Sequence, residues 1–157
     1  MIIVIKLGTS SICNEVTFVP NLANLALLVE TVVSLRTLGH KVLLVSSGAI
    51  GMGLVALNMA KKPLQVSKIQ ALAAVGQGRL IALYDSLFSH FGVRIAQILL
   101  TRDNMSERST YSNACATLKE LLELDVVPIV NENDSVSSSE IRFGDNDSLA
   151  ALTSAMV

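Results

Sequence analysis

The sequence predicts an open α/β fold, an αβα sandwich in which a mostly parallel sheet carries helices on both faces. Short apolar runs rich in Val, Ile and Leu alternate along the chain with longer segments of helical periodicity. Hydrophobic residues make up 51% of the sequence and charged residues 16%, which suits strands that are buried on both faces. The 157 residues fit one domain with a sizeable core.

Each element follows from its own pattern of apolar residues. Strands are expected at residues 2–7, 41–46, 93–100 and 126–130. Helices are expected at about residues 20–38, from about 49, at about 66–91, at 110–124 and from 146. Gly39 and Gly92 fall where a helix passes into a strand, as expected of left-handed helix caps.

Composition narrows the classes of partner. Mean hydropathy is +0.55, but the most apolar stretch, residues 22–38, is interrupted by Asn24, Glu30 and Arg36, so no membrane span is expected. A net charge of −1 without a basic stripe, and the absence of Trp, argue against a nucleic-acid partner. Small anionic ligands remain compatible with this composition.

The cysteines and histidines predict neither disulfides nor a metal site. Cys13 and Cys115 are isolated, and no charged leader precedes the first strand, so a cytoplasmic location is expected. His40 and His90 lie where helical patterns end, a position that suits a cationic surface or capping residue.

Two acidic, amide-rich clusters are the strongest indication of a site. The cluster NEND at 131–134 follows a predicted strand, and GDND at 144–147 opens the last predicted helix. The alternative is turn and cap chemistry, which Asn and Asp also favour. Their convergence on the carboxyl edge of one sheet, where open α/β folds bind ligands, favours a binding site.

Lys6 lies near the end of the first predicted strand, just before Gly8. A lysine within an apolar strand is costly unless it is paired, so the ammonium could face a phosphate that the Gly8 backbone also approaches. The alternative is a lysine of an edge strand whose side chain reaches solvent.

Ser47 and Gly48 stand between the second strand and a predicted helix. The positive end of a helix suits a carboxylate or phosphate, whereas the alternative is an ordinary serine N-cap. The polar stretch 101–104 after the third strand is expected to be a loop that could contact a substrate or effector.

Two glycine motifs are not assigned to nucleotide binding. GMGLVA at 51–56 fits the dinucleotide fingerprint formally, but it lies within a predicted helix and no acidic residue follows at the required spacing. GQG at 76–78 is better explained by close helix packing or by a helix break.

These motifs, taken together, resemble the amino-acid kinase family over essentially the whole chain, and within it the glutamate 5-kinases. The segments that carry the resemblance are VIKLGT at 4–9, SSGAI at 46–50, AAVGQGRL at 73–80, QILLTR at 97–102, PIVNEND at 128–134 and FGDND at 143–147. Six motifs in the family's order are a specific signal.

The resemblance implies a role for each matching residue. Lys6 would contact the phosphates of ATP and the transferred phosphoryl group, with Gly8 in the accompanying loop. Asp145 would organise the catalytic lysines, and Asp147 would be a neighbouring polar support. The glutamate-binding residues would be Ser47 with Gly48, Asp134 and Asn146.

The implied reaction is the ATP-dependent phosphorylation of the γ-carboxylate of L-glutamate, the first step of proline biosynthesis. Mg²⁺ would arrive with the nucleotide, held by phosphates and water, so no metal ligands are expected in this chain. Feedback by proline and a homo-oligomer are implied by the resemblance alone.

Residues 1–157 are expected to be the N-terminal, glutamate-binding part of a kinase domain, because the family's C-terminal half has no counterpart here, nor does its RNA-binding-type PUA domain. The apolar pattern at 149–157 also stops without a helix cap. Two alternatives are a non-catalytic fragment that binds glutamate or proline or associates with kinase subunits, and another amino-acid kinase such as acetylglutamate kinase.

Overall fold

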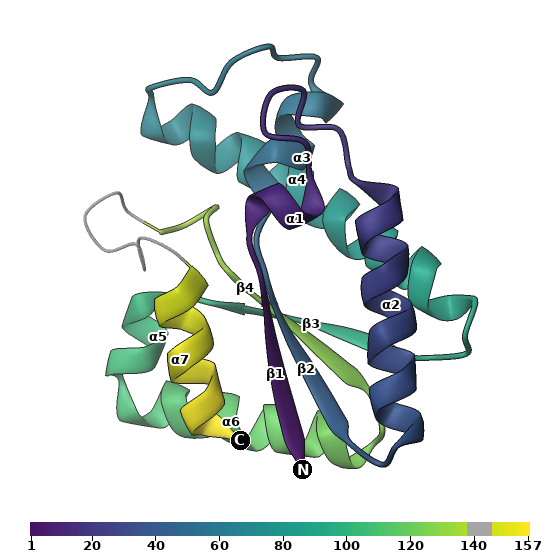
Figure 1. Ribbon diagram of the computed structural model, residues 1–157. Coiled ribbons are helices and arrows are strands. Elements are labelled where there is room, and N and C mark those ends of the chain that lie inside the picture. The colour runs from purple at the N-terminus through teal and green to yellow at the C-terminus, as the bar shows by residue number, and fades with distance from the viewer. Residues whose placement is uncertain (138–145) are drawn as a thin grey trace.

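A parallel sheet forms the centre of the molecule in the computed structural model, which describes residues 1–137 and 146–157 (Figure 1). Its strands, in spatial order β1-β2-β4-β3, all run in the same direction. They are β1 (Ile2–Leu7), β2 (Lys41–Ser46), β3 (Ile95–Leu100) and β4 (Val127–Glu132). The predicted α/β class and parallel sheet are confirmed.

Helices connect the strands and flank the sheet. They are α1 (Thr9–Ile12), α2 (Leu22–Thr37), α3 (Ala49–Ala56), α4 (Val66–Ser89), α5 (Arg102–Ser106), α6 (Arg108–Glu123) and α7 (Asn146–Met156). The long helices match their predicted positions. Helix α2 begins later than expected because the side chain of Asn21 caps it, accepting the N–H of Asn24 at 3.2 Å.

Helix α5 corrects the prediction of a loop at residues 101–104. Thr101 and Asn104 form a reciprocal capping box: the Thr101 hydroxyl accepts the Asn104 N–H at 3.3 Å, and the Asn104 side chain accepts the Thr101 N–H at 2.8 Å. These bonds satisfy donors that a short helix would otherwise leave open. The other short helix, α1, was not predicted either.

Strand β4 extends two residues beyond its predicted end. Asn131 and Glu132 pair with Leu99 and Leu100 of β3, and both are largely buried. The turn begins only at Asn133, whose carbonyl accepts the N–H groups of Val136 and Ser137. Two polar residues that were predicted to follow the strand are therefore part of it, and the strand is a central one.

Strand β2 divides the core between two layers of helices. Val42 and Leu44 face a cluster with residues of α2, α3 and α4, whereas Leu43 and Val45 face a cluster with residues of α6 and α7. Figure 1 shows α2 and α7 on opposite sides of β1 and β2. This alternation is the reason the strand reads as one continuous apolar run.

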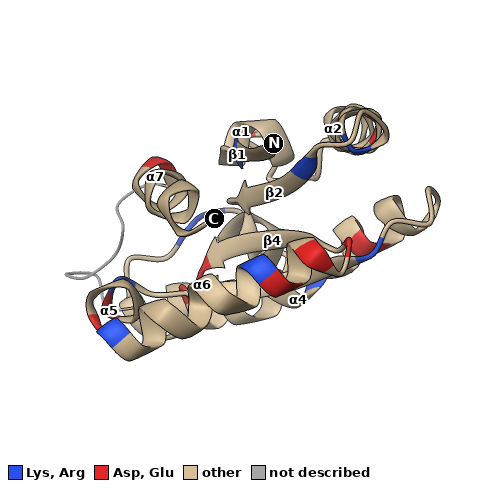
Figure 2. Ribbon diagram, turned by 90° about the horizontal axis from the view of Figure 1, so that it is seen from below, with Lys and Arg blue, Asp and Glu red and all other residues tan. Residues whose placement is uncertain are grey.

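The surface of the described chain mixes both signs of charge. Figure 2 shows basic and acidic residues interspersed over helices and connections. No helix in residues 1–137 or 146–157 combines the length and the apolar character needed to cross a membrane.

Helices α3 and α4 pack backbone against backbone at two glycines. A methyl group on Gly76 would overlap the carbonyl oxygen of Ala49, and one on Gly53 would overlap that of Leu72. Helix α4 continues through Gly76 without a break, so close helix packing is the correct explanation of the GQG motif. The contact fixes α3, and hence its N-terminus, relative to α4.

Tyr84 connects α4 to the end of β2. Its hydroxyl lies 3.0 Å from that of Ser46, and neither residue is exposed to solvent. Burial raises the pKa of Tyr84 to about 12. The neutral phenol is therefore part of the folded structure.

We expect Gly76→Ala to destabilise the protein by about 1–3 kcal/mol, the usual cost of overpacking, because α3 and α4 have to separate. Gly78→Ala is the matched control on the same helix: its methyl group would meet nothing within 4 Å. That change should stabilise the helix by about 0.5–1 kcal/mol. Urea unfolding followed by circular dichroism measures both, and equal stability of the two variants would contradict the backbone contact.

We also expect the free energy of unfolding to decrease between pH 10 and pH 12 through Tyr84. In the unfolded chain this phenol ionises near pH 10, whereas in the folded protein it keeps its proton to about pH 12. Each pH unit in this window removes about 1.4 kcal/mol. Tyr84→Phe should lack this component, so parallel stability–pH curves for wild type and variant would disprove the burial of the hydroxyl.

Candidate functional site

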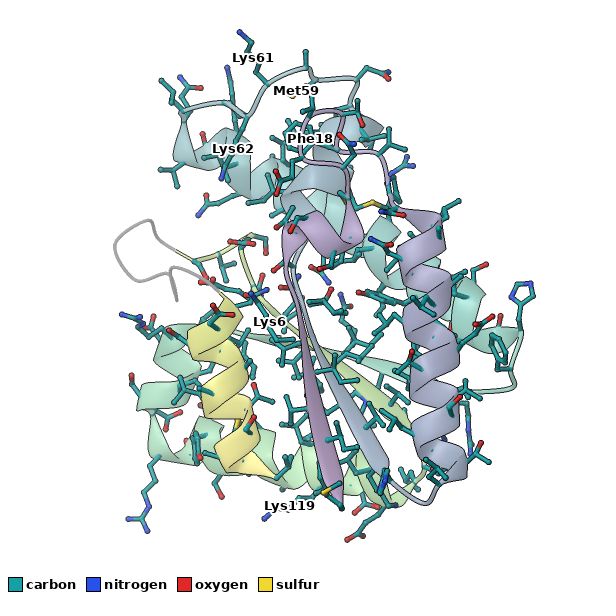
Figure 3. The ribbon with its side chains drawn as sticks, viewed as in Figure 1. Lys6, Phe18, Met59, Lys61, Lys62 and Lys119 are labelled. Atoms are coloured by element: carbon teal, nitrogen blue, oxygen red, sulfur yellow. The ribbon has the colours of Figure 1, made fainter. Side chains whose placement is uncertain are left out.

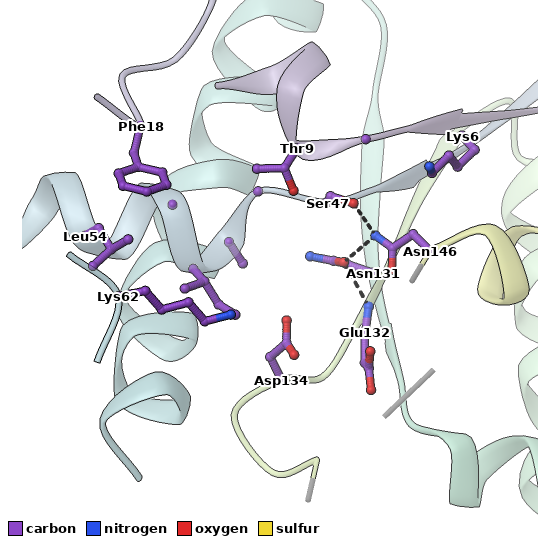
Figure 4. A pocket seen from close by; sticks show the side chains of 15 residues that line it. Lys6, Thr9, Phe18, Ser47, Leu54, Lys62, Asn131, Glu132, Asp134 and Asn146 are labelled. Atoms are coloured by element: carbon purple, nitrogen blue, oxygen red, sulfur yellow. Dashed lines mark hydrogen bonds between the residues drawn. The ribbon is translucent and has the colours of Figure 1, made fainter. Parts of the chain in front are cut away.

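The carboxyl ends of β1, β2 and β4 open onto a cavity of about 430 Å³ (Figure 4). It lies at the edge of the sheet where the sequence predicted a site. The described residues predicted for that site all line it: Lys6, Gly8, Ser47, Gly48, Asp134 and Asn146. Asp145, predicted to be catalytic, lies outside the described residues.

Lys6 reaches the cavity from β1 and forms an ion pair with α7. Its ammonium lies 2.6 Å from Asp147 Oδ1, and the two side chains are 34% and 67% exposed. Strand β1 is an edge strand of the described sheet. The alternative for Lys6, a lysine of an edge strand, is therefore right about where the strand lies. An ion pair this exposed adds little stability, and in the structure it places the ammonium beside the first turn of α7.

Gly48 gives α3 an N-terminus that opens into the cavity. Its φ of 99° lies in the left-handed region that favours glycine, and a Cβ there would press on the Ile12 side chain at 3.2 Å. Gly48 itself is the N-cap, and no side chain among the described residues caps this helix, so the ordinary serine N-cap is wrong for Ser47. The first N–H groups of α3, which an α-helix cannot bond internally, lie in the wall of the cavity.

Asn146, the first residue of α7, ties that helix to the end of β2. Its Nδ2 donates to the Ser46 carbonyl at 2.5 Å and to the Ser47 hydroxyl at 2.7 Å. The Ser46 carbonyl can only accept, which fixes the orientation of the amide. The Ser47 hydroxyl accepts this bond and keeps its own proton to donate.

Asn131 extends the network to α4. Its Nδ2 donates to Gln77 Oε1 at 2.8 Å, and its Oδ1 accepts the N–H of Glu132 at 2.9 Å and lies 3.5 Å from Asn146 Nδ2. With 3% of its surface exposed, Asn131 is a buried polar group whose partners hold it in place. Four elements thus meet through side-chain amides: β2, β4, α4 and α7.

Several wall residues were not predicted. Phe18, Leu54 and Lys62 come from connections or helix faces that carry no site signal in the sequence, and Thr9 lies in the motif at 4–9 but was given no role of its own. Gln77 was assigned only to helix packing, although its amide supports Asn131. The polar stretch 101–104 does not line this cavity.

Asp134 borders two cavities, as Glu132 does. It lines the main cavity and also a second one of about 310 Å³ between α4 and β3. In residues 1–137 and 146–157, His, Cys, Asp and Glu side chains form no group of three or more that could hold a metal ion. Both cysteines are free thiols.

Comparison with known proteins agrees with the fold and the motifs. The chain is 61% identical over 155 residues to a Schizosaccharomyces pombe protein named probable glutamate 5-kinase. It is 53% and 50% identical over 155 residues to proteins named glutamate 5-kinase from Rippkaea orientalis and Nostoc punctiforme. These alignments cover 99% of this chain but 39%, 42% and 42% of the relatives, so the chain spans about two fifths of their length.

The family comparison covers the whole chain. Residues 1–157 match the amino acid kinase family, in agreement with the parallel sheet and with the cavity at its carboxyl edge. The chain therefore belongs to the amino acid kinase family.

Proposed function

We propose that this chain supplies the glutamate-binding part of a glutamate 5-kinase, which transfers the γ-phosphoryl group of ATP to the γ-carboxylate of L-glutamate. The observation that carries the proposal is the gathering of Lys6, the Ser47–Gly48 turn, Asp134 and Asn146 around one cavity. Relatives named glutamate 5-kinase at 50–61% identity support the choice of substrate.

The chemistry of the substrate explains what this site has to provide. A γ-carboxyl group has a pKa of about 4.3, so at neutral pH it is already ionised and needs no general base. Its reaction with a phosphoryl group brings two anions together. The site therefore has to cancel their repulsion and hold them in line.

Lys6 and the N-terminus of α3 provide positive potential at the cavity. The Lys6 ammonium is oriented by Asp147, and the α3 terminus carries about half a positive charge. Positive charge placed where negative charge develops stabilises the transition state, and both groups lie at the cavity for this role. Lys6 is accordingly proposed to contact the phosphoryl group, with Gly8 in the adjoining loop.

Polar groups farther along the cavity suit the amino-acid substrate. Ser47 keeps a proton to donate to a carboxylate oxygen because Asn146 already donates to its Oγ. Asp134 would accept the α-ammonium group rather than act as a base. Asn146 then serves as a residue that binds glutamate and holds Ser47.

The remaining parts of the proposal rest on the resemblance and on the family. ATP would enter with Mg²⁺, whose ligands would be mainly phosphates and water. Asp145 would organise the catalytic lysines, and residues 1–157 would form the N-terminal part of the kinase domain. Proline feedback, a homo-oligomer and a cytoplasmic location stay predictions.

Calorimetric titration with L-glutamate and, separately, with Mg-ATP tests the function of the purified chain. Glutamate binding together with glutamate-dependent ADP formation would support the kinase. Glutamate binding without ADP formation would mean that this chain binds glutamate but does not catalyse the transfer by itself. Absence of glutamate binding would refute the proposed function.

Given glutamate-dependent ADP formation by the wild-type chain, we expect Lys6→Ala to remove most of it, by about 100-fold or more, because a cation no longer meets the transferred phosphoryl group. Lys119→Ala is the matched control, since Lys119 is an exposed lysine on α6, far from Lys6 in Figure 3. An equal decrease in both variants would point to a nonspecific charge effect.

Asp134→Asn should weaken glutamate binding about tenfold or more, because the amide lacks the charge that pairs with the α-ammonium group. Asp85→Asn, at an exposed position on α4 outside the cavity, controls for the change in net charge. Calorimetry gives the affinities and thermal unfolding the stabilities. Unchanged glutamate affinity in Asp134→Asn would remove Asp134 from the site.

A further inference from the structure

Two adjacent lysines in the connection between α3 and α4 differ in where they point. Lys61 and Lys62 are both exposed, but only Lys62 lines the main cavity. Figure 3 shows Lys61 directed away from the molecule and Lys62 directed back towards it. The sequence gives no reason for this difference, so it comes from the fold.

The charged groups of the cavity are arranged with alternating sign. Figure 4 shows Lys62 and Asp134 pointing toward one another, with Lys6 at the opposite side of the cavity from Lys62. Thr9 and the Ser47–Gly48 turn lie between the two lysines. The other charged lining residue, Glu132, is largely buried at the end of β4.

This order of charges matches the groups of an amino acid with an acidic side chain. Its side-chain carboxylate is separated from the α-carbon, which carries an ammonium and a carboxylate side by side. If Asp134 accepts the α-ammonium, the α-carboxylate has to lie next to it, within reach of a cation on the facing wall. Lys6, across the cavity, is left for the side-chain carboxylate and the phosphoryl group.

We propose that Lys62 binds the α-carboxylate of the amino-acid substrate and so helps to select an α-amino acid over an acid or amine that lacks this group. The proposal rests on the proposed function and adds a residue to it. A long, flexible lysine on a connection suits this role, because a point charge tolerates some variation in the position of the carboxylate.

The ion pair between Lys6 and Asp147 argues against a shared role for the two lysines. Lys6 is oriented at the carboxyl end of β1, close to Gly8, whose added Cβ would lie 3.7 Å from the Lys6 ammonium. Lys62 instead approaches from the α3–α4 connection, where its nearest charged counterpart in Figure 4 is Asp134. A contact with nucleotide phosphates is therefore assigned to Lys6 and not to Lys62.

The test compares Lys62→Met, which keeps most of the apolar stem, with Lys61→Met as the matched control and Lys62→Arg as the conservative variant. Calorimetry with L-glutamate, 4-aminobutanoate and Mg-ATP is done on each protein; 4-aminobutanoate is glutamate without its α-carboxylate. Lys62→Met should bind glutamate about tenfold more weakly, the loss of one charge-assisted hydrogen bond. It should lose no affinity for 4-aminobutanoate or Mg-ATP.

Lys61→Met should bind glutamate like the wild type, and Lys62→Arg should retain most of the affinity. Because Lys62 is exposed, all three variants should unfold at the wild-type temperature. Equal glutamate affinity in Lys62→Met and wild type would overturn the inference alone. So would an equal loss in Lys61→Met, or a loss that concerns Mg-ATP instead of glutamate. A wild-type chain that binds no glutamate would refute the proposed function and this inference together.

Discussion

The side-chain amide of Asn146 is the contact on which the geometry of the cavity depends. It joins the first residue of α7 to the last carbonyl of β2 and to the Ser47 hydroxyl, groups about a hundred positions apart in the chain. Through Asn131 the same network reaches Gln77 of α4. Helices from both faces of the sheet therefore meet at its carboxyl edge, and a buried network with its partners in place is rigid.

The fold was predictable because parallel strands that are buried on both faces appear in the sequence as short, continuous apolar runs. Leu43 and Val45 face one layer and Val42 and Leu44 the other, so β2 has to be apolar throughout. The predictions that differ from the structure concern polar residues at a strand end and very short helices. Asn131 and Glu132 were placed after the strand because only their pairing with β3 shows that it continues. Helices of four or five residues, such as α1 and α5, are too short for a hydrophobic period.

The candidate site was predictable to the extent that its residues lie at strand ends and helix starts. Lys6, Ser47 and Asn146 occupy such positions, and parallel strands bring those positions to one edge. Residues that reach the cavity only through tertiary packing left no such signal. Lys62 shares its local sequence with Lys61, and Gln77 looks like any polar residue of a helix surface; only the folded chain shows that the first lines the cavity and the second bonds Asn131.

The glycine contact between α3 and α4 has a consequence for how this protein can vary. Gly53 and Gly76 bring two backbones together with no side chains between them, so there is no layer in which a larger residue could be absorbed by repacking. Gly76 therefore sets the position of the α3 N-terminus although it forms no part of the cavity wall, and any larger residue there would move the site without touching it.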